Sequence, residues 1–246
     1  MKKLLYITTL FSLLMTGCQK ETQTHYILYV EQEAGIEPFQ TRILVNEEFI
    51  RFDDGNGTND FVLLNRDEQR IYSVNHGMRS VMILEPKKFE AESPFELIHS
   101  VKVMGDMKEA PEINGIKPVH YQFSTNKQVC VDVITVDGLM PEAVEAYREF
   151  QMILASDSAN TINNLPADLQ EPCTIALSTF APVRHLQYGF PVQEWKPGYS
   201  RSLMDYKIDF EPAPDAFLVP DDYFMYTVQQ FREGRVDLEE RKVISE

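Results

Sequence analysis

The chain reads FIRF at residues 49–52, FVLL at 61–64, RIYSV at 70–74 and VMIL at 81–84. These apolar runs recur about every ten residues and are separated by polar clusters, such as DDGNG at 53–57. Glycines in such clusters supply the positive φ angles that tight turns require. Short strands at this spacing are typical of an antiparallel meander, so we predict that this part of the chain folds as an antiparallel sheet.

The same pattern extends on both sides of this stretch. We predict further strands at 26–31, 42–45, 95–103, 119–124, 129–134, 190–195 and 200–210. The strands at 119–124 and 129–134 are expected to form a hairpin around Thr125, Asn126 and Lys127. Residues 174–177 fit either a strand or a helix.

One segment has a helical period instead. Six apolar side chains recur at helical spacing between residues 140 and 154, and Pro141 suits a first helical turn. The six are Met140, Ala143, Val144, Tyr147, Phe150 and Leu154. We predict an amphipathic helix over 141–155 that lies on the sheet. The expected fold class is α+β, a strongly curved antiparallel β-sheet (half-barrel) with one or two packed helices.

The N-terminus has the pattern of a secretory signal. Lys2 and Lys3 precede an uncharged run over 4–14, and small residues precede Cys18. The alternatives are an ordinary signal peptide with a chance cysteine, or an uncleaved anchor, but the apolar run is shorter than the roughly 20 residues that span a bilayer.

The sequence LMTGC at 14–18 resembles the lipobox of bacterial lipoproteins, with Met15 where that family usually has Leu. The resemblance implies that residues 1–17 are a lipoprotein signal peptide, that Cys18 is lipidated, and that 18–24 form a tether. Because Gln19 rather than Asp follows the cysteine, it also implies sorting to the outer membrane, with the protein facing the periplasm. Multiple acyl chains suffice for stable membrane anchoring.

Composition indicates a folded and acidic body. The chain is 43% hydrophobic and 11% aromatic, which argues against disorder. Removing Lys2 and Lys3 with the signal peptide leaves 21 basic and 38 acidic side chains, a formal charge of −17. Such a body is a poor candidate for nucleic acid. We expect a single domain over 25–225 and a partly helical C-terminal tail over 226–246.

Two cysteines remain after processing. In an oxidising compartment Cys130 and Cys173 are expected to form a disulfide, with two separate buried thiols as the alternative. The five histidines, His25, His76, His99, His120 and His185, are scattered without a metal-binding spacing. Neither a nucleophile elbow nor a nucleotide-binding loop occurs. We therefore expect no metal, no cofactor and no enzymatic activity.

Aromatic side chains are the remaining candidates for a binding site. They either line an apolar groove on the concave face of the sheet or fill the core. The candidates are Phe49, Phe52, Phe61, Tyr72, Tyr121, Phe123 and Trp195, with Tyr206 beside them.

A wider resemblance covers roughly residues 25–225. The phrases at 49–55, 61–65 and 71–74 resemble the half-barrel shared by the Lol lipoprotein carriers and several uncharacterised lipoprotein families. YGFP at 188–191, RSL at 201–203 and FLVPDDY at 217–223 look like the ending of a bacterial domain family of unknown function. The resemblance implies a membrane-anchored, non-catalytic protein that binds a lipid, acyl chain or lipoprotein. The alternative is a structural or interaction lipoprotein of the envelope, with a filled core and a protein partner.

Overall fold

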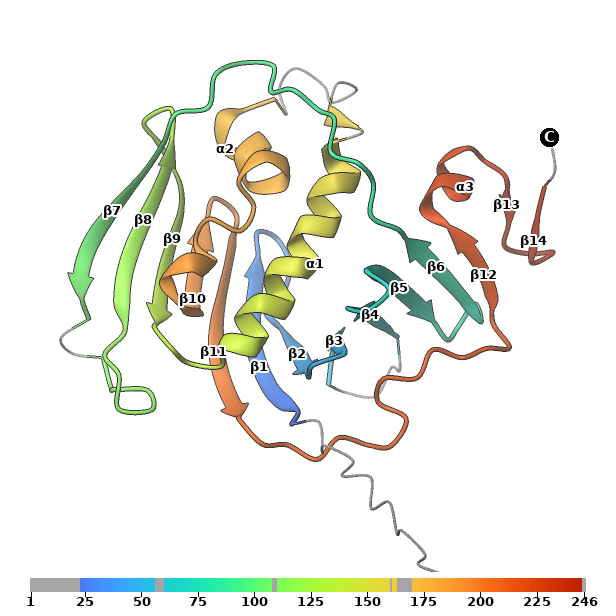
Figure 1. Cartoon of the computed structure of the whole chain (residues 1–246), viewed down its shortest axis with the longest axis horizontal. Helices are drawn as coiled ribbons and strands as arrows, with labels where there is room; N and C mark the ends of the chain where they lie inside the picture. The colour runs from blue at the N-terminus through green and yellow to red at the C-terminus, as the bar shows by residue number, and fades with distance from the viewer. Residues whose placement is uncertain (1–22, 56–59, 108–109, 160, 163–169, 245–246) are drawn as a thin grey trace, which may run out of the picture.

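A single large sheet organises the chain. The computed structural model describes residues 23–55, 60–107, 110–159, 161–162 and 170–244, and within them twelve strands form the sheet in the order β12-β6-β5-β4-β3-β2-β1-β11-β10-β9-β8-β7 (Figure 1). The strands of this sheet are β1 His25–Glu33, β2 Phe39–Val45, β3 Phe49–Asp53, β4 Phe61–Asn65, β5 Arg70–Asn75, β6 Ser80–Leu84, β7 His99–Asp106, β8 Val119–Thr125, β9 Gln128–Val136, β10 Phe190–Lys196, β11 Tyr199–Lys207 and β12 Phe224–Thr227. The helical segments are α1 Pro141–Ala159, α2 Pro172–Ile175, η3 Ala176–Phe180, η4 Leu186–Tyr188 and α3 Val228–Arg232.

The pairing confirms an α+β fold with a large antiparallel sheet. Neighbouring strands of the described sheet pair antiparallel, except that β12 pairs parallel with β6. The segment 174–177 is helical and belongs to α2 and η3. β7 starts at His99, four residues later than predicted, because the Asn126 side chain bonds to Ile98 N and Glu96 O. β11 ends at Lys207 rather than at Phe210.

The helix α1 covers one face of the sheet, which we call the inner face. Its alanines at positions 143 and 146 are fully buried, and such small side chains let the helix approach the strands closely. Phe52 of β3 packs on Tyr147 and Phe150 of the helix, with ring centroids 6.1 and 4.5 Å apart. The Arg66 guanidinium, just after β4, donates two hydrogen bonds of 2.8 Å to Glu149. The predicted amphipathic helix is therefore present, and it extends to Ala159.

The opposite, outer face is covered in part by residues 208–223, which we call the closing segment. This segment follows β11 and leads to β12, along the lower edge of the view in Figure 1. Its apolar side chains, among them Phe217 and Val219, pack on a second core cluster around Phe61 and Leu63 of β4. The Phe217 ring stacks on Phe49 at 5.4 Å. Apolar side chains are therefore buried on both faces of β3–β6.

The C-terminal residues are part of the fold. The domain boundary expected after residue 225 falls inside β12, so the sheet continues into the segment predicted as a tail. In that segment α3 is helical, and its Arg232 donates hydrogen bonds of 2.8 and 2.6 Å to Asp157 of α1. Two short strands, β13 Val236–Asp237 and β14 Lys242–Val243, pair beyond it.

Candidate functional site

The seven aromatics predicted to line one apolar groove are not brought together. Phe52 points to α1, whereas Phe49, three residues earlier, packs against the closing segment on the other face. Successive strand side chains alternate between the two faces, so residues three apart necessarily separate. Phe61 and Tyr72 share the outer cluster of Phe49, Tyr121 and Phe123 pack against Tyr188, and Trp195 lies 5.1 Å from the His120 ring. The prediction of a groove formed by these residues is therefore wrong. Tyr206 packs against the hydrophobic core between the sheet and α1.

The inner face beneath α1 is nearly filled. The space between the helix and the strands holds about 20 Å³ and is lined by residues such as Ile27, Ile43, Val144 and Phe190. A volume of that size accommodates about one water molecule. An acyl chain therefore has no room there while α1 is in place.

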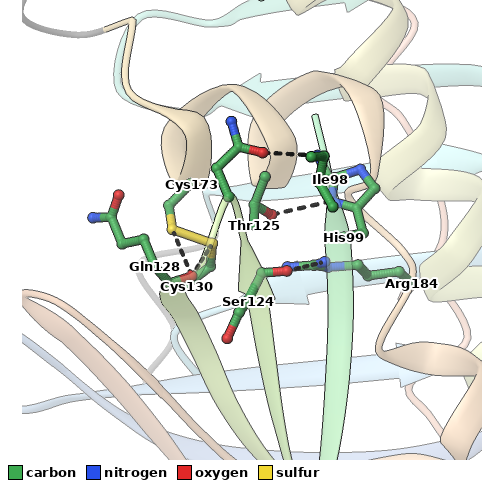
Figure 2. The surroundings of a disulfide bond; sticks show 9 residues. Ile98, His99, Ser124, Thr125, Gln128, Cys130, Cys173 and Arg184 are labelled. Atoms are coloured by element: carbon green, nitrogen blue, oxygen red, sulfur yellow. Dashed lines mark hydrogen bonds between the residues drawn. A yellow bond between two sulfur atoms is a disulfide. The ribbon is translucent and has the colours of Figure 1, made fainter. Parts of the chain in front are cut away.

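Two of the predicted functional cysteines can be placed. Cys130 of β9 and Cys173 of α2 form a disulfide, with their Cα atoms 5.0 Å apart, as predicted (Figure 2). Cys18 and the signal peptide lie outside the described residues. The disulfide fixes α2 and the following η3 to the sheet, where Leu177 of η3 packs on Val131 and Val133.

Polar contacts beside the disulfide hold the same end of the sheet. Figure 2 shows the Arg184 guanidinium reaching Ser124 of β8, to whose carbonyl Nη1 donates a 2.9 Å hydrogen bond. His99 of β7 lies 3.1 Å from the Thr125 hydroxyl. The segment after η3 is thereby joined to β8 by a side chain as well as by apolar packing.

A cavity lies on the outer face, between the closing segment and β2–β4, and we call it the outer cavity. It has a volume of about 500 Å³. Its walls are formed by Arg42, Leu44, Arg51, Phe61, His76, Phe210, Ala213, Asp215, Ala216, Leu218 and Pro220. Most of these side chains are apolar, and the polar ones include two guanidinium groups.

Both arginines of the outer cavity are held by one buried carboxylate. Arg42 donates from Nε and Nη2 to Asp53 at 2.7 and 2.8 Å, and Arg51 Nε donates at 2.7 Å. Arg51 Nη1 also donates to the Ala216 carbonyl at 2.6 Å, and its guanidinium lies 3.9 Å from the centre of the Phe61 ring. Burial opposes ionisation of Asp53, but hydrogen bonds from the two arginines hold its pKa below the usual value. The group of three charges therefore carries a net positive charge.

A second charged cluster is buried on the inner face. Glu31, Arg201 and Glu194 stand opposite one another on β1, β11 and β10. Arg201 forms an ion pair with Glu194, and His185 Nε2 lies 3.1 Å from the same carboxylate. Burial would raise the pKa of Glu194, but the Arg201 charge and the neighbouring His185 ring lower it to about 2. Glu194 is therefore an anion at every ordinary pH.

Three tyrosines complete this cluster. The Arg201 guanidinium lies 4.8 Å from the Tyr29 ring and 4.9 Å from the Tyr147 ring, and its Nη1 donates to the Tyr147 hydroxyl at 2.9 Å. The Tyr199 hydroxyl donates to Glu31 at 2.7 Å. Burial raises the pKa of each of these tyrosines above its usual value. All three stay protonated and serve as hydrogen-bonding groups.

Sequence reasoning did not identify this cluster. The available signal was the alternation in β11, where Arg201 occupies the same face as Tyr199 and Leu203. A charged residue on an apolar face of a strand is unexpected unless a partner is buried with it. The partners come from β10 and from the segment before η4, and no spacing in the sequence relates them.

Within the described ranges, no cluster of three or more histidine, cysteine, aspartate or glutamate side chains suited to a metal ion occurs. Of the scattered histidines, His120 lies 2.8 Å from Asp132, and His76 lies 2.6 Å from the Tyr223 hydroxyl.

Among the helices of the described residues, none combines the length and apolar character needed to cross a membrane.

Comparisons with known proteins give matches among solved structures only. Neither a protein-family model nor a curated protein matches the chain. Among solved structures, the chain is similar to an uncharacterized conserved protein from Thermus thermophilus, with a TM-score of 0.42, 7% identity, and coverage of 83% of this chain and 90% of that one. It is also similar to PNGF-II in its C2 crystal form, with a TM-score of 0.41, 12% identity, and coverage of 86% of this chain and 32% of that one.

Proposed function

We propose that the protein is a non-catalytic lipoprotein of the bacterial outer membrane that faces the periplasm. Its proposed ligand is an amphiphile with one acyl chain and an anionic head group, which binds in the outer cavity. The body is proposed to be a half-barrel whose concave face is occupied by α1. The N-terminal signal and Cys18 support the anchor, and a Cys130–Cys173 disulfide is consistent with an oxidising compartment.

The size and lining of the outer cavity carry this proposal. Its volume of about 500 Å³ lies within the usual range of ligand pockets. A cavity of roughly 150 Å³ holds the six carbons of benzene, so about 20 non-hydrogen atoms fit here. A single acyl chain with a carboxylate head is of that size.

The charges of the cavity suit an anionic head group. Asp53 engages Arg42 through Nε and Nη2, and Arg51 through Nε, which leaves the Arg42 Nη1 and Arg51 Nη2 groups to donate to a ligand. Guanidinium groups bind carboxylates and phosphates strongly. Asp215 is exposed on the closing segment, so its charge is screened by solvent.

Native mass spectrometry of the detergent-purified protein tests the proposal. We expect a co-purifying species of fatty-acid mass and, after delipidation, uptake of palmitate. Ala213→Trp places an indole at the cavity wall and should abolish uptake, whereas Ala34→Trp, at an exposed position outside the cavity, should not. A clean apo mass without palmitate uptake, or uptake that survives Ala213→Trp, would refute an acyl ligand at this site.

A second candidate function is binding of a protein partner, favoured by the edge strand β7. This strand ends the sheet, and no described strand pairs with its outer side (Figure 1). Val101, Val103 and Met104 on it are 42%, 60% and 45% exposed. An exposed apolar edge can accept an added strand from another chain. A photo-crosslinker at Val103, but not at Met204 on the internal strand β11, should then capture one stoichiometric partner.

A further inference from the structure

A separate small cavity adjoins the buried cluster of Glu194, Arg201 and His185, and we call it the side cavity. It has a volume of about 100 Å³. By the comparison with benzene, it encloses roughly four non-hydrogen atoms. Its polar lining includes Tyr147, Gln151, His185, Lys196 and Tyr199, next to Glu194 and Arg201. It lies on the inner face, so a ligand bound there is independent of the outer cavity and of its ligand.

The fixed charges of the side cavity leave a positive end. Glu194 and Arg201 form an ion pair, so their charges largely cancel. Lys196 lies on the solvent side of the lining and is exposed, with its ammonium group 4.7 Å from the Tyr199 ring. No described carboxylate lies within ion-pair distance of this ammonium group. The mouth of the cavity therefore favours a negatively charged group.

Several hydrogen-bonding groups in the lining are unused. The Tyr147 hydroxyl accepts from Arg201, and within the described part of the chain its own proton has no acceptor. The Gln151 side chain likewise makes no hydrogen bond to any described residue. These groups, together with Lys196, are donors that match the oxygens of a carboxylate.

His185 supplies a hydrogen-bond acceptor to the side cavity. The residue is 7% exposed, and its Nδ1 has no hydrogen-bond partner among the described residues. Because Nε2 lies 3.1 Å from a Glu194 carboxylate oxygen, Nδ1 is the ring nitrogen left for a ligand, and it accepts from a hydroxyl in the tautomer that carries its proton on Nε2. A buried acceptor without a partner is costly, so a hydroxyl donor at this position is favourable.

We infer that the side cavity binds a short 2-hydroxycarboxylate. Its carboxylate accepts hydrogen bonds from Lys196, Gln151 and Tyr147 at the mouth, and its hydroxyl donates to His185 Nδ1. The aliphatic carbons contact the apolar wall formed by Val131, Leu177 and Pro182. The enclosed volume accommodates three carbons and the hydroxyl, while the carboxylate oxygens lie at the exposed lysine.

Calorimetric titration of the full-length protein with lactate, propionate and 1-propanol tests this inference. Lactate should bind most tightly. Propionate, which lacks the hydroxyl, should bind about ten-fold more weakly, since a hydrogen bond to a buried or charged partner is worth roughly ten-fold in affinity. Propanol, which lacks the carboxylate, should not bind measurably. Equal binding of lactate and propionate would overturn the role of His185, and no heat with either acid would overturn the site.

Two variants locate the binding. Lys196→Met and Gln151→Leu should each weaken lactate binding about ten-fold. Lys127→Met, at a lysine that is also exposed and lies in the β8–β9 turn, should leave it unchanged. Neither side chain forms a hydrogen bond within the described structure, so the variants should keep the parent's unfolding temperature. Undiminished lactate binding in both, with an unchanged unfolding temperature, would show that the ligand lies elsewhere.

Discussion

At the scale of single residues, Gly189 is the described glycine at which an added Cβ would meet the closest contacts. It joins η4 to β10 with φ 115° and ψ −170°, a backbone conformation that essentially only glycine adopts. An added Cβ would lie 2.6 Å from the Val136 carbonyl oxygen and 2.8 Å from the Asp137 Cα. Both neighbours are backbone atoms of the adjacent chain, so neither can rotate away. The residue is thus required by its conformation and by close packing.

We expect Gly189→Ala to lower the free energy of unfolding by about 3 kcal/mol or more, because backbone strain and a clash add together. Urea denaturation followed by circular dichroism measures the change. Gly234→Ala is the matched control, since Gly234 has φ 67° but no atom within 4 Å of an added Cβ. It should lose only about 1–2 kcal/mol, the cost of a left-handed residue. Equal losses in the two variants would show that the contact with β9 is not restrictive.

At the scale of elements, the disulfide determines how firmly α2 and η3 cover the sheet. α2 has only four residues, too few for a helix to be stable alone. Replacing Cys130 and Cys173 together by serine should cost about 4 kcal/mol in the chain-entropy description of a loop of this length. The unfolding midpoint in urea, compared with and without a reductant, measures this. If a reductant shifts the unfolding midpoint of the parent no more than that of the variant, the disulfide does not stabilise the fold as expected.

Elements formed by local patterns could be predicted from the sequence. The runs at 49–52, 61–64, 70–74 and 81–84 all became strands, because alternation and turn residues act over a few neighbours. The helix over 141–155 was found for the same reason. The parallel pairing of β12 with β6 was not predicted, because it joins segments about 140 residues apart and depends on the path of the closing segment.

The candidate sites were predictable only where one residue type carries the signal. The Cys130–Cys173 disulfide could be predicted because these are the two cysteines other than Cys18, which the sequence predicts to be lipidated. Aromatic side chains carry no such information, since Phe49 and Phe52 look alike in the sequence but face opposite layers. The cavities depend on how three strands and a loop meet, which no local pattern records.

At the scale of the whole molecule, the buried cluster couples the stability of the fold to pH. Glu194 connects β10 to Arg201 of β11 and to His185 before η4. Its pKa falls from the ordinary 4.5 to about 2 on folding, chiefly because the Arg201 charge outweighs the effect of burial. Asp53 on the outer face and Asp157 of α1 also have lowered pKa values, owing to their arginine partners. All three therefore act in the same direction.

An acid whose pKa is lower in the folded chain stabilises the fold above its unfolded pKa, and this contribution is lost as the pH falls toward the folded pKa. For Glu194 the full contribution of about 3 kcal/mol is present above pH 4.5 and disappears as the pH approaches 2.

Glu194→Gln should be less stable than the parent at pH 7, because it leaves Arg201 buried without its counter-ion. Urea unfolding at pH 7, 4 and 2.5 should show the two proteins converging as the pH falls. Glu90→Gln, at an exposed residue, is the control and should have the stability of the parent at every pH. A difference in stability between Glu194→Gln and the parent that stays constant across this range would mean that Glu194 does not titrate as the cluster requires.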